Sequence, residues 1–353
     1  MRCTAPMGVL FTLVSLLELA VTLRIAAFNI RTFGETKMSN ATISSYIVKV
    51  SSGWPMPESR QTPGEMVASL RPRKSVSLRP YQHLGGCQGC RIFGCLMPGA
   101  AGGRAVHPAC LAKLLWPLPQ ILSRYDIAVV QEVRDSHLVA IGKLLDELNR
   151  AKPDTYRYVV SEPLGRSSYK EQYLFLYRPD QVSVLDSYYY DDGCEPCGND
   201  TFSREPAIVK FFSPFTEVRE FAIVPLHAAP TDAVTEIDAL YDVYLDVQKK
   251  WDLEDVILMG DFNAGCSYVS STQWSSIRLR TSPAFQWLIP DSADTTVTST
   301  HCAYDRIVVA GALLQSAVVP NSVGPFDFQA AFGLSKQLAE AISDHYPVEM
   351  TLK

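Results

Sequence analysis

Carboxylate, amide and imidazole side chains stand directly after apolar runs at several places in this sequence. In the segment VILMGDFNAGCSY, residues 256–268, Asp261 and Asn263 follow four apolar residues and a glycine. Asp, Asn and Gly are turn formers, so this segment taken alone favours a simple turn. The alternative is a metal or phosphate site at the carboxyl end of a buried strand, because hard divalent cations prefer oxygen ligands.

The same placement recurs at the ends of other apolar runs, for Asn29, Glu132, His227 and Asp344, which precedes His345, and Asp305 stands beside a further run in AYDRIV. Each of these residues by itself is better explained as a turn former or a satisfied core group. In a packed sheet, however, neighbouring strand ends meet at one rim, where oxygen ligands would suit Mg²⁺. Two histidines beside carboxylates would suit general acid–base chemistry at a phosphate, because a neighbouring carboxylate orients the imidazole and favours its charged form.

The elements that must position these residues are short segments rich in Val, Ile, Tyr and Phe, bounded by turn residues. We predict strands at 23–30, 126–133, 173–179, 219–228, 255–263 and 304–311. Residues 232–251 carry apolar side chains at helical spacing, including Ile237, Leu240, Tyr244 and Leu245. Helices between many strands indicate an α/β sandwich of two packed sheets with helices outside.

Composition places the chain among ordinary globular proteins. Of 353 residues, 47% are hydrophobic and 20% charged, which is enough for one large domain or two smaller ones. The net charge is −5, and the sequence shows no basic stripe of the kind typical of nucleic-acid binders. A polyanionic substrate would therefore need local arginines and a bound cation to offset the acidic field.

The first 22 residues have the pattern of a secretory signal peptide, with an apolar core at residues 7–20 that is too short to span a bilayer. A buried amino-terminal helix is the alternative. No other apolar run is long enough to cross a membrane, so we expect a secreted, extracellular protein. The sequons at Asn40 and Asn199 fit glycosylation of such a protein.

Residues 49–119 differ from the rest of the chain. Pro, Gly, Ser and Arg are frequent there, no periodicity persists, and we expect a disordered or loosely ordered insert. Joined across this insert, residues 39–48 and 120–126 form one helical pattern, with Tyr46, Ile47 and Ile121 on a shared face. A functional insertion would more often lie in a loop. A retained non-coding stretch translated in frame is the interpretation that we favour.

The insert contains Cys and His residues at spacings that can bind zinc, namely Cys87, Cys90, Cys95, His107 and Cys110. The pattern has one close cysteine pair instead of two and no framework around it. Unpaired or wrongly paired thiols are therefore the favoured interpretation over a zinc site.

Outside the insert, several segments carry a likeness to a known family: IAAFNI, VVQEVRD, PLHAAP, GDFNAGCSY, CAYDRIVV and SDHYPVE, within residues 23–48 and 120–353. Through them the chain resembles the secreted mammalian deoxyribonucleases of the endonuclease/exonuclease/phosphatase superfamily. The resemblance implies a single catalytic domain over residues 23–353, interrupted by the insert. It implies a four-layer α/β/β/α sandwich of two packed mixed sheets with outer helices, and metal-dependent endonucleolytic hydrolysis of DNA.

The resemblance also assigns roles to individual residues. His227 and His345 match the paired catalytic histidines, with Glu171 supporting the first and Asp305 the second. The positions that hold divalent metal and the scissile phosphate are matched by Asn29, Glu132, Asp261, Asn263 and Asp344. Contacts with double-stranded DNA, through the minor groove and a phosphate, are matched by Arg134, Tyr169 and Arg204.

Stabilising features follow from the same resemblance. It pairs Cys194 with Cys197 and Cys266 with Cys302. It implies two Ca²⁺ sites, one formed by Asp192, Asp200, the Phe202 carbonyl and Glu205, the other by Asp294, Thr296 and Thr298. Solvated acidic loops without an ion are the alternative. The family's actin contact, around residues 158–160, carries over only as a hypothesis, and we expect a monomer.

Three functions compete. The first is a secreted, Mg²⁺-dependent and Ca²⁺-dependent endonuclease acting on DNA by histidine-pair acid–base catalysis. The second is a phosphoesterase of the same superfamily acting on lipids or inositol phosphates. The arginine and tyrosine positions and the two disulfide pairs argue against this function. The third is a catalytically impaired or unsecreted isoform, in which the insert disrupts the first helix and displaces Glu132.

Overall fold

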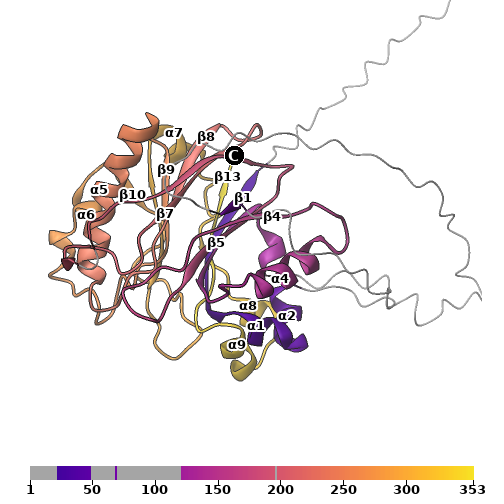
Figure 1. Cartoon of the computed structure of the whole chain (residues 1–353). Helices are drawn as coiled ribbons and strands as arrows, with labels where there is room; N and C mark the ends of the chain where they lie inside the picture. Colours follow the sequence, from indigo (N-terminus) through magenta and orange to yellow (C-terminus); the bar gives the residue numbers. More distant parts are fainter. Residues whose placement is uncertain (1–21, 49–67, 70–120, 195–196) are drawn as a thin grey trace, which may run out of the picture.

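The computed structural model describes residues 22–48, 68–69, 121–194 and 197–353 (Figure 1). The predicted signal peptide lies outside the described residues except for Thr22, and the predicted insert except for Ala68 and Ser69. Among the described residues, no helix has both the length and the apolar character needed to cross a membrane.

Two sheets form the centre of the fold. The first has seven strands in the order β12-β13-β1-β3-β5-β4-β2. Their bounds are Gly324–Pro325, Val348–Leu352, Leu23–Phe33, Ile127–Val133, Gln172–Tyr177, Arg157–Val160 and Ala68–Ser69. The sheet is mixed, because β1 runs parallel to β3 whereas β13 and β5 pair with them in antiparallel register.

The second sheet has six strands in the order β10-β11-β9-β8-β7-β6. Their bounds are Phe285–Trp287, Asp305–Ala310, Val256–Asp261, Glu220–Pro225, Ala207–Phe212 and Ser183–Tyr189. Strands β8 and β9 run parallel, and the other neighbours are antiparallel.

Helices cover the outer face of each sheet (Figure 1). Those packed on the first sheet are α1 (Glu35–Ser39), α2 (Ala41–Ile47), α4 (Val139–Asn149), α8 (Phe328–Phe332) and α9 (Lys336–Ile342). Those packed on the second are α5 (Ala233–Trp251) and α6 (Arg278–Thr281). The remaining short elements are η1 (Leu122–Arg124), η3 (Trp274–Ser276) and α7 (Ala312–Ala317).

Alternating side chains build three apolar layers between these elements. In β1, Ala26, Phe28 and Ile30 pack against the helices, whereas Ile25 and Ala27 face the second sheet. In β9 the residues at even positions pack on α5, and those at odd positions face the first sheet. Both strands are therefore buried on two sides, as their continuous apolar runs require. The predicted four-layer sandwich is confirmed.

The predicted strands match observed ones, with two shifts that concern the site. The predicted segment 255–263 is a strand only over β9, so Asn263 lies two residues beyond the strand end. The predicted segment 219–228 is a strand only over β8, so His227 lies two residues beyond the strand end. The predicted helix 232–251 is α5, but Leu245 of its predicted apolar face is 44% exposed. The buried stripe instead passes through Ala233, Glu236 and Val243.

The two chain ends that flank the predicted insert meet in the structure. Helix α2 ends at Ile47, and the amide of Ile121 donates a hydrogen bond to the carbonyl of Tyr46 at 3.4 Å. Ile47, Ile121 and Leu122 are buried in one cluster. The Asn40 side chain caps α2 by accepting hydrogen bonds from the amides of Thr42 and Ile43.

Because both flanks already pack on the first sheet, removal of residues 49–119 should leave the fold intact apart from the two-residue edge strand β2, which the deletion removes. We expect the deletion variant to unfold cooperatively with a Tm within ~5 °C of the full chain, a shift that corresponds to one or two kcal/mol. Thermal unfolding followed by circular dichroism measures this difference. A deletion variant without a cooperative transition would contradict the expectation that 49–119 are separable from the domain.

Candidate active site

Two imidazoles, each bound to its own carboxylate, lie where the strand ends of both sheets converge. His227 Nδ1 lies 2.7 Å from Glu171 Oε2, and His345 Nδ1 lies 2.7 Å from Asp305 Oδ2. Their Nε2 atoms both face Asp261 Oδ2, at 3.7 and 3.6 Å. With Nδ1 occupied, each ring presents Nε2 toward the space beside Asp261.

Asp261 is the shared centre of this arrangement. Its Oδ2 accepts a hydrogen bond from Asn29 Nδ2 at 3.0 Å, and its Oδ1 accepts one from the Asn263 amide at 3.0 Å. Asn263 has a positive φ of 49°, and its side-chain amide donates to the carbonyl of Ala228. The acid–glycine–amide pattern after β9 is therefore both a turn and part of a site.

The buried carboxylates favour the charged imidazoles. Burial opposes the charged form of His345, but Asp305 and Asp261 outweigh it and raise its pKa to about 10. Burial likewise opposes the charge on His227, whose pKa is nevertheless raised by Glu171 and Asp261. Burial works against ionisation of Asp261 as well, yet the two imidazoles lower its pKa. The neighbouring carboxylates therefore favour the charged form of both rings, and burial opposes it.

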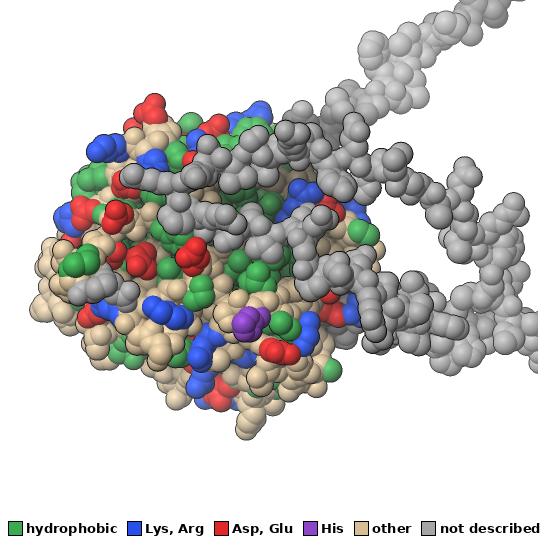
Figure 2. Space-filling view, viewed as in Figure 1, with side chains coloured by type: hydrophobic (Ala, Val, Ile, Leu, Met, Phe, Trp, Pro, Cys, Tyr) green, Lys and Arg blue, Asp and Glu red, His purple; other side chains and the backbone are tan. Residues whose placement is uncertain are grey.

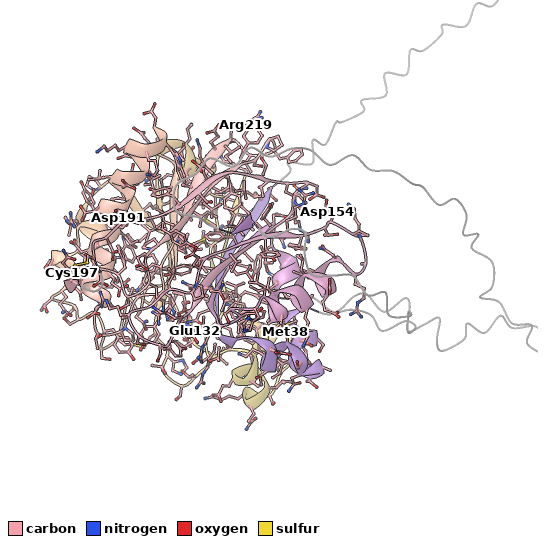
Figure 3. The ribbon with its side chains drawn as sticks, viewed as in Figure 1. Met38, Glu132, Asp154, Asp191, Cys197 and Arg219 are labelled. Carbon is pink, nitrogen blue, oxygen red and sulfur yellow. A yellow bond between two sulfur atoms is a disulfide. The ribbon has the colours of Figure 1, made fainter. Side chains whose placement is uncertain are left out.

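An irregularity in the first sheet carries Glu132 to this edge. The register between β1 and β3 shifts after Asn29, and Thr32 and Glu132 both have positive φ, of 51° and 56°. The Thr32 amide donates to Glu132 Oε2 at 2.9 Å. Such bulges redirect side chains at sheet edges. In the view of Figure 3, Glu132 is labelled toward the bottom of the molecule, as is Met38 of α1, and Asp191 and Cys197 are labelled at the left.

Lys37 interacts electrostatically with both Glu132 and Asp344. Its Nζ donates to the carbonyls of Arg31 and Ile342, the second at 2.6 Å. Burial lowers the pKa of Lys37 to about 8, although Asp344 and Glu132 act in the opposite direction. Asp344 also lies 3.6 Å from Arg31 Nη1. Glu132 and Asp344 thus share one cationic neighbour, which the sequence analysis did not identify.

Two further polar residues that sequence analysis missed hold the site together. Gln131 is fully buried; its Nε2 donates to the carbonyl of Leu226, and its Oε1 accepts from the Asp261 amide at 2.8 Å. Ser343 Oγ donates to the carbonyl of Asn29 and accepts from the His345 amide. Both stand beside predicted residues, yet nothing in their own spacing distinguishes them.

The residues present fit a divalent metal. The oxygens Asn29 Oδ1 and Asp344 Oδ1 are buried and have no hydrogen-bond partner among the described residues. Asp261, Asp305 and His345 offer ligand atoms within 4.8 Å of one another. Carboxylate and amide oxygens are the donors that Mg²⁺ prefers. Asp305 Oδ1 is likewise buried without a hydrogen-bond partner among the described residues, so it joins Asn29 Oδ1, Asp344 Oδ1 and Asp261 among the atoms that fit a cation.

The predicted DNA-contacting residues lie beside this centre. The guanidinium of Arg134 is 4.3 Å from the ring centroid of Tyr169, which is 42% exposed. Arg204 is more enclosed. Its Nε lies 2.8 Å from Glu171 Oε2, and its Nη1 donates to the carbonyl of His227. Arg134 and Tyr169 are therefore accessible to a ligand, whereas Arg204 is largely committed to the Glu171–His227 pair.

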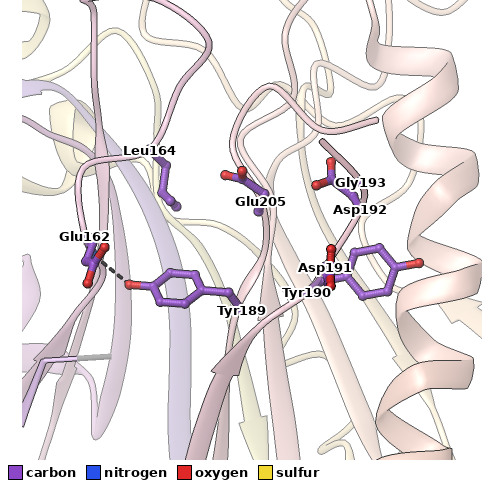
Figure 4. Close-up of a pocket in the computed structure, with 8 residues that line it drawn as sticks. All are labelled: Glu162, Leu164, Tyr189, Tyr190, Asp191, Asp192, Gly193 and Glu205. Carbon is purple, nitrogen blue, oxygen red and sulfur yellow. Dashed lines mark hydrogen bonds between the residues drawn. The ribbon is translucent and has the colours of Figure 1, made fainter. Parts of the chain in front are cut away.

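Of the residues predicted for the first Ca²⁺ site, Asp192 and Glu205 line one cavity and Asp200 does not. Asp192 and Glu205 line a cavity with Glu162 and Asp191 (Figure 4). Asp192 Oδ2 accepts from the amides of Thr201 and Phe202. Asp200, which is not among the residues lining this cavity, lies 2.7 Å from Arg166 Nε.

The second predicted set is organised around Asp294. Its Oδ1 accepts from the amide and hydroxyl of Thr296, and its Oδ2 lies 2.6 Å from His301 Nδ1. Thr298 Oγ1 lies instead 2.7 Å from the hydroxyl of Thr300. Burial opposes ionisation of Asp294, but His301 and Thr296 lower its pKa.

Both predicted disulfides, Cys194–Cys197 and Cys266–Cys302, are confirmed. The two sequon residues are exposed. Asn199 Oδ1 accepts a hydrogen bond from the Cys194 amide, and the side chain of Asn40 accepts the hydrogen bonds that cap α2. Figure 2 shows acidic and basic side chains interspersed on the face in view, in keeping with a surface that lacks a basic stripe there.

Glu236, in the first turn of α5, is a fully buried acid that the sequence analysis did not identify. Its Oε1 accepts from the amides of Ser203 and Ala229, at 3.1 and 3.3 Å. Its Oε2 is buried without a partner among the described residues. Its helical spacing could have shown that it is buried, because Glu236 stands three residues after Ala233 and four before Leu240, on the buried stripe of α5.

Paired imidazole–carboxylate groups at the strand ends of a four-layer sandwich suit hydrolysis of a phosphoester. The Endonuclease/Exonuclease/phosphatase family matches residues 108–345. Deoxyribonuclease-1 of Mus musculus is 69% identical over 353 residues, covering 100% of this chain and 99% of its own length. Deoxyribonuclease-1 of Homo sapiens is 64% identical and covers 100% of both chains. The chain therefore belongs to the endonuclease/exonuclease/phosphatase family and, within it, to the deoxyribonuclease-1 group.

Among solved structures, a humanized D. rerio TDP2 covers 94% of this chain and 99% of its own, with a TM-score of 0.49 and 12% identity. That likeness carries no argument about function.

Stability should depend on pH through Glu236. Burial raises its pKa to about 7, against the lowering effect of the two amide bonds. Because the folded-state pKa exceeds the unfolded value, its contribution is complete below the unfolded pKa and is lost as pH rises toward 7. We expect a loss of about 3 kcal/mol in the free energy of unfolding over that window.

Glu236→Gln lacks this titration, so its stability relative to the parent chain should increase from pH 5 to pH 7.5. Urea unfolding at both pH values measures the difference. An equal difference at the two pH values would show that Glu236 does not titrate with a raised pKa.

Proposed function

We propose that this chain is a secreted, divalent-metal-dependent endonuclease that hydrolyses phosphodiester bonds of double-stranded DNA with little sequence preference. The observation that carries the proposal is the approach of His227 Nε2 and His345 Nε2 to the same atom, Asp261 Oδ2, at 3.7 and 3.6 Å. The similarity to proteins named deoxyribonuclease-1 supports DNA as the substrate.

The paired histidines can divide the proton transfers of hydrolysis. One imidazole accepts the proton of the attacking water, and the other donates a proton to the leaving oxygen. Glu171 and Asp305 fix the ring orientations through the two Nδ1 contacts. Each carboxylate also stabilises the imidazolium that forms when its ring gains a proton, because the pairs are shielded from water.

Asn29, Glu132, Asp261, Asn263 and Asp344 would hold Mg²⁺ and orient the scissile phosphate. When bound, the cation would supply charge stabilisation to the phosphoryl oxygens. Asn29 and Asn263 suit this role, because their amide nitrogens are bound to Asp261 and to the Ala228 carbonyl and their oxygens are left for a ligand.

DNA would be bound through the backbone and the minor groove. Arg134 and Tyr169 form an exposed cation–aromatic pair of a size that suits insertion into a groove. Arg204 keeps guanidinium hydrogens near His227 that could meet a phosphate. Such contacts depend on groove width and bendability and weaken with salt, so sequence preference is low.

The remaining assignments belong to the same proposal. They are a signal peptide at residues 1–22, glycans on Asn40 and Asn199, Ca²⁺ at the loops of Asp192 and Asp294, a monomeric state, and an actin contact near residues 158–160. The cavity carboxylates of Asp192 and Glu205 support the first Ca²⁺ loop. The Asp294–Thr296 contacts support the second.

His227→Ala or His345→Ala should lower the rate of plasmid nicking by roughly 10²- to 10⁴-fold, because each removes a proton-transfer group. The Tm should also fall, because each substitution leaves a buried carboxylate without its imidazole, but unfolding should remain cooperative. His301→Ala is the matched control, since His301 also binds an aspartate through Nδ1 but is 72% exposed. Nicking by either active-site variant at the parental rate would remove the catalytic assignment.

Removal of divalent cations with EDTA should abolish nicking, and added Mg²⁺ should restore it. Mg²⁺ should also raise the Tm, because an ion that binds the folded state alone stabilises it. Asp344→Asn and Asn29→Leu should weaken that Tm increase, whereas Asp246→Asn, remote on α5, should preserve it. An unchanged Mg²⁺-induced Tm increase in the first two variants would place the ion elsewhere.

A further inference from the structure

Glu236 is a buried acid to which the proposed reaction assigns no task. It lies in the first turn of α5, on the outer side of the second sheet. Its Oε1 accepts from two backbone amides that belong to different loops, those of Ser203 and Ala229. Ser203 directly precedes Arg204, and Ala229 follows His227 by two residues. One oxygen atom therefore ties together the two segments that carry Arg204 and His227.

Other contacts connect the same two segments. The Tyr173 hydroxyl accepts from the His227 amide at 3.0 Å and donates to the Arg204 carbonyl at 3.4 Å. Arg204 Nη1 donates to the His227 carbonyl at 3.0 Å. The guanidinium also binds Glu171, the acid that orients the His227 ring. The backbone beside Arg204 thus determines where the guanidinium meets the Glu171–His227 pair.

The Glu236 contact is the one that reaches this cluster from a long helix. Helix α5 runs from Ala233 to Trp251 and buries Ile237, Leu240 and Val243 against the second sheet. The loop that contains Ser203 has no strand or helix of its own between Asp200 and Pro206. Helix α5 can therefore hold the loop of Ser203 in place, and with it Arg204. The contact requires an acceptor oxygen at the position of Glu236 Oε1.

We propose that Glu236 is a positioning residue for the active site: by accepting the amide hydrogens of Ser203 and Ala229, it holds Arg204 against the Glu171–His227 pair. Its kinetic consequences rest on the proposed function, but its structural consequences do not. The role requires the acceptor oxygen and not the negative charge, so glutamine can replace glutamate.

The kinetic test compares Glu236→Ala, Glu236→Gln and Asp246→Ala in the full-length chain with Mg²⁺ and plasmid DNA. We expect Glu236→Ala to lower kcat roughly 10- to 100-fold with a smaller change in KM, because small displacements of positioned groups are costly to catalysis. Glu236→Gln should retain most of the parental kcat. Asp246 is the matched control, since it is another carboxylate of α5 that accepts a hydrogen bond from outside the helix, from the Tyr188 hydroxyl.

The structural test follows the Nδ1–H proton of His227 by NMR, with the signal assigned by its absence in His227→Ala. Glu236→Ala should shift or broaden this signal, whereas Glu236→Gln and Asp246→Ala should preserve it. If Glu236→Ala does not fold, Glu236→Asp replaces it, since the shorter side chain withdraws the oxygen while keeping the charge. Parental kcat together with an unshifted His227 signal in Glu236→Ala or Glu236→Asp would overturn the proposal.

The two proposals fail in different ways. A parent chain that does not nick DNA would refute the proposed function, while the NMR comparison would still test the positioning role. A nicking parent chain whose kcat and His227 signal are indifferent to Glu236 would refute the positioning role alone. Failure of glutamine to restore kcat would also count against it, because the role assigned here depends on an acceptor and not on charge.

Discussion

The buried side-chain amide of Gln131 is the contact on which the active site depends. An apolar layer fixes the distance between two packed sheets but does not fix their relative sliding, since dispersion and hydrophobic contacts have little directionality. Gln131 extends from β3 and binds the carbonyl of Leu226 and the amide of Asp261, both at strand ends of the other sheet. These directed bonds set the height of Asp261 and His227 relative to Asn29.

Gly260 makes this contact sterically possible. Its φ of 137° favours glycine, and a Cβ added there would lie 2.4 Å from both Gln131 Nε2 and the Leu226 carbonyl oxygen. The glycine that ends the apolar run before Asp261 is therefore needed for the approach of the two sheets as well as for the turn. The oxygen and the nitrogen of the Gln131 side chain both have backbone partners in the other sheet. These bonds stabilise one relative position of the two sheets, because sliding would leave buried polar groups unpaired, which is costly.

The strand-end residues could be predicted from the sequence because they combine two local features: a continuous apolar run and a polar residue directly after it. That pattern correctly located Asp261 at the end of β9, and burial on two sides explains the apolar run before it. Asn263 lies two residues beyond that strand, and Asp305 is instead the first residue of β11. Residues such as Gln131 and Ser343 could not be found in this way. The carbonyls to which they donate, those of Leu226 and Asn29, are 95 and 314 positions away along the chain, and only the pairing of sheets and loops brings them together.

Helix α5 illustrates a second limit of prediction. Apolar spacing correctly located the helix but set its buried stripe too far round, toward Leu245, because a buried glutamate does not add to an apolar pattern. The stripe that packs on the sheet contains Glu236, which carries a polar contact into the core. The same tension applies throughout the site, since Asn29, Glu171 and Asp305 are nearly inaccessible.

Most of the buried polar groups at the site bind one another, and these mutual contacts explain how the site is built. Glu171 is bound by His227 and Arg204, and Arg204 in turn meets the His227 carbonyl. Asp305 is bound by His345, whose backbone is bound by Ser343. Removal of any one member leaves a buried partner unpaired, so the network resists rearrangement. Each imidazole is fixed through Nδ1 by its own carboxylate. Its Nε2 is directed toward Asp261, where a substrate and a cation would bind.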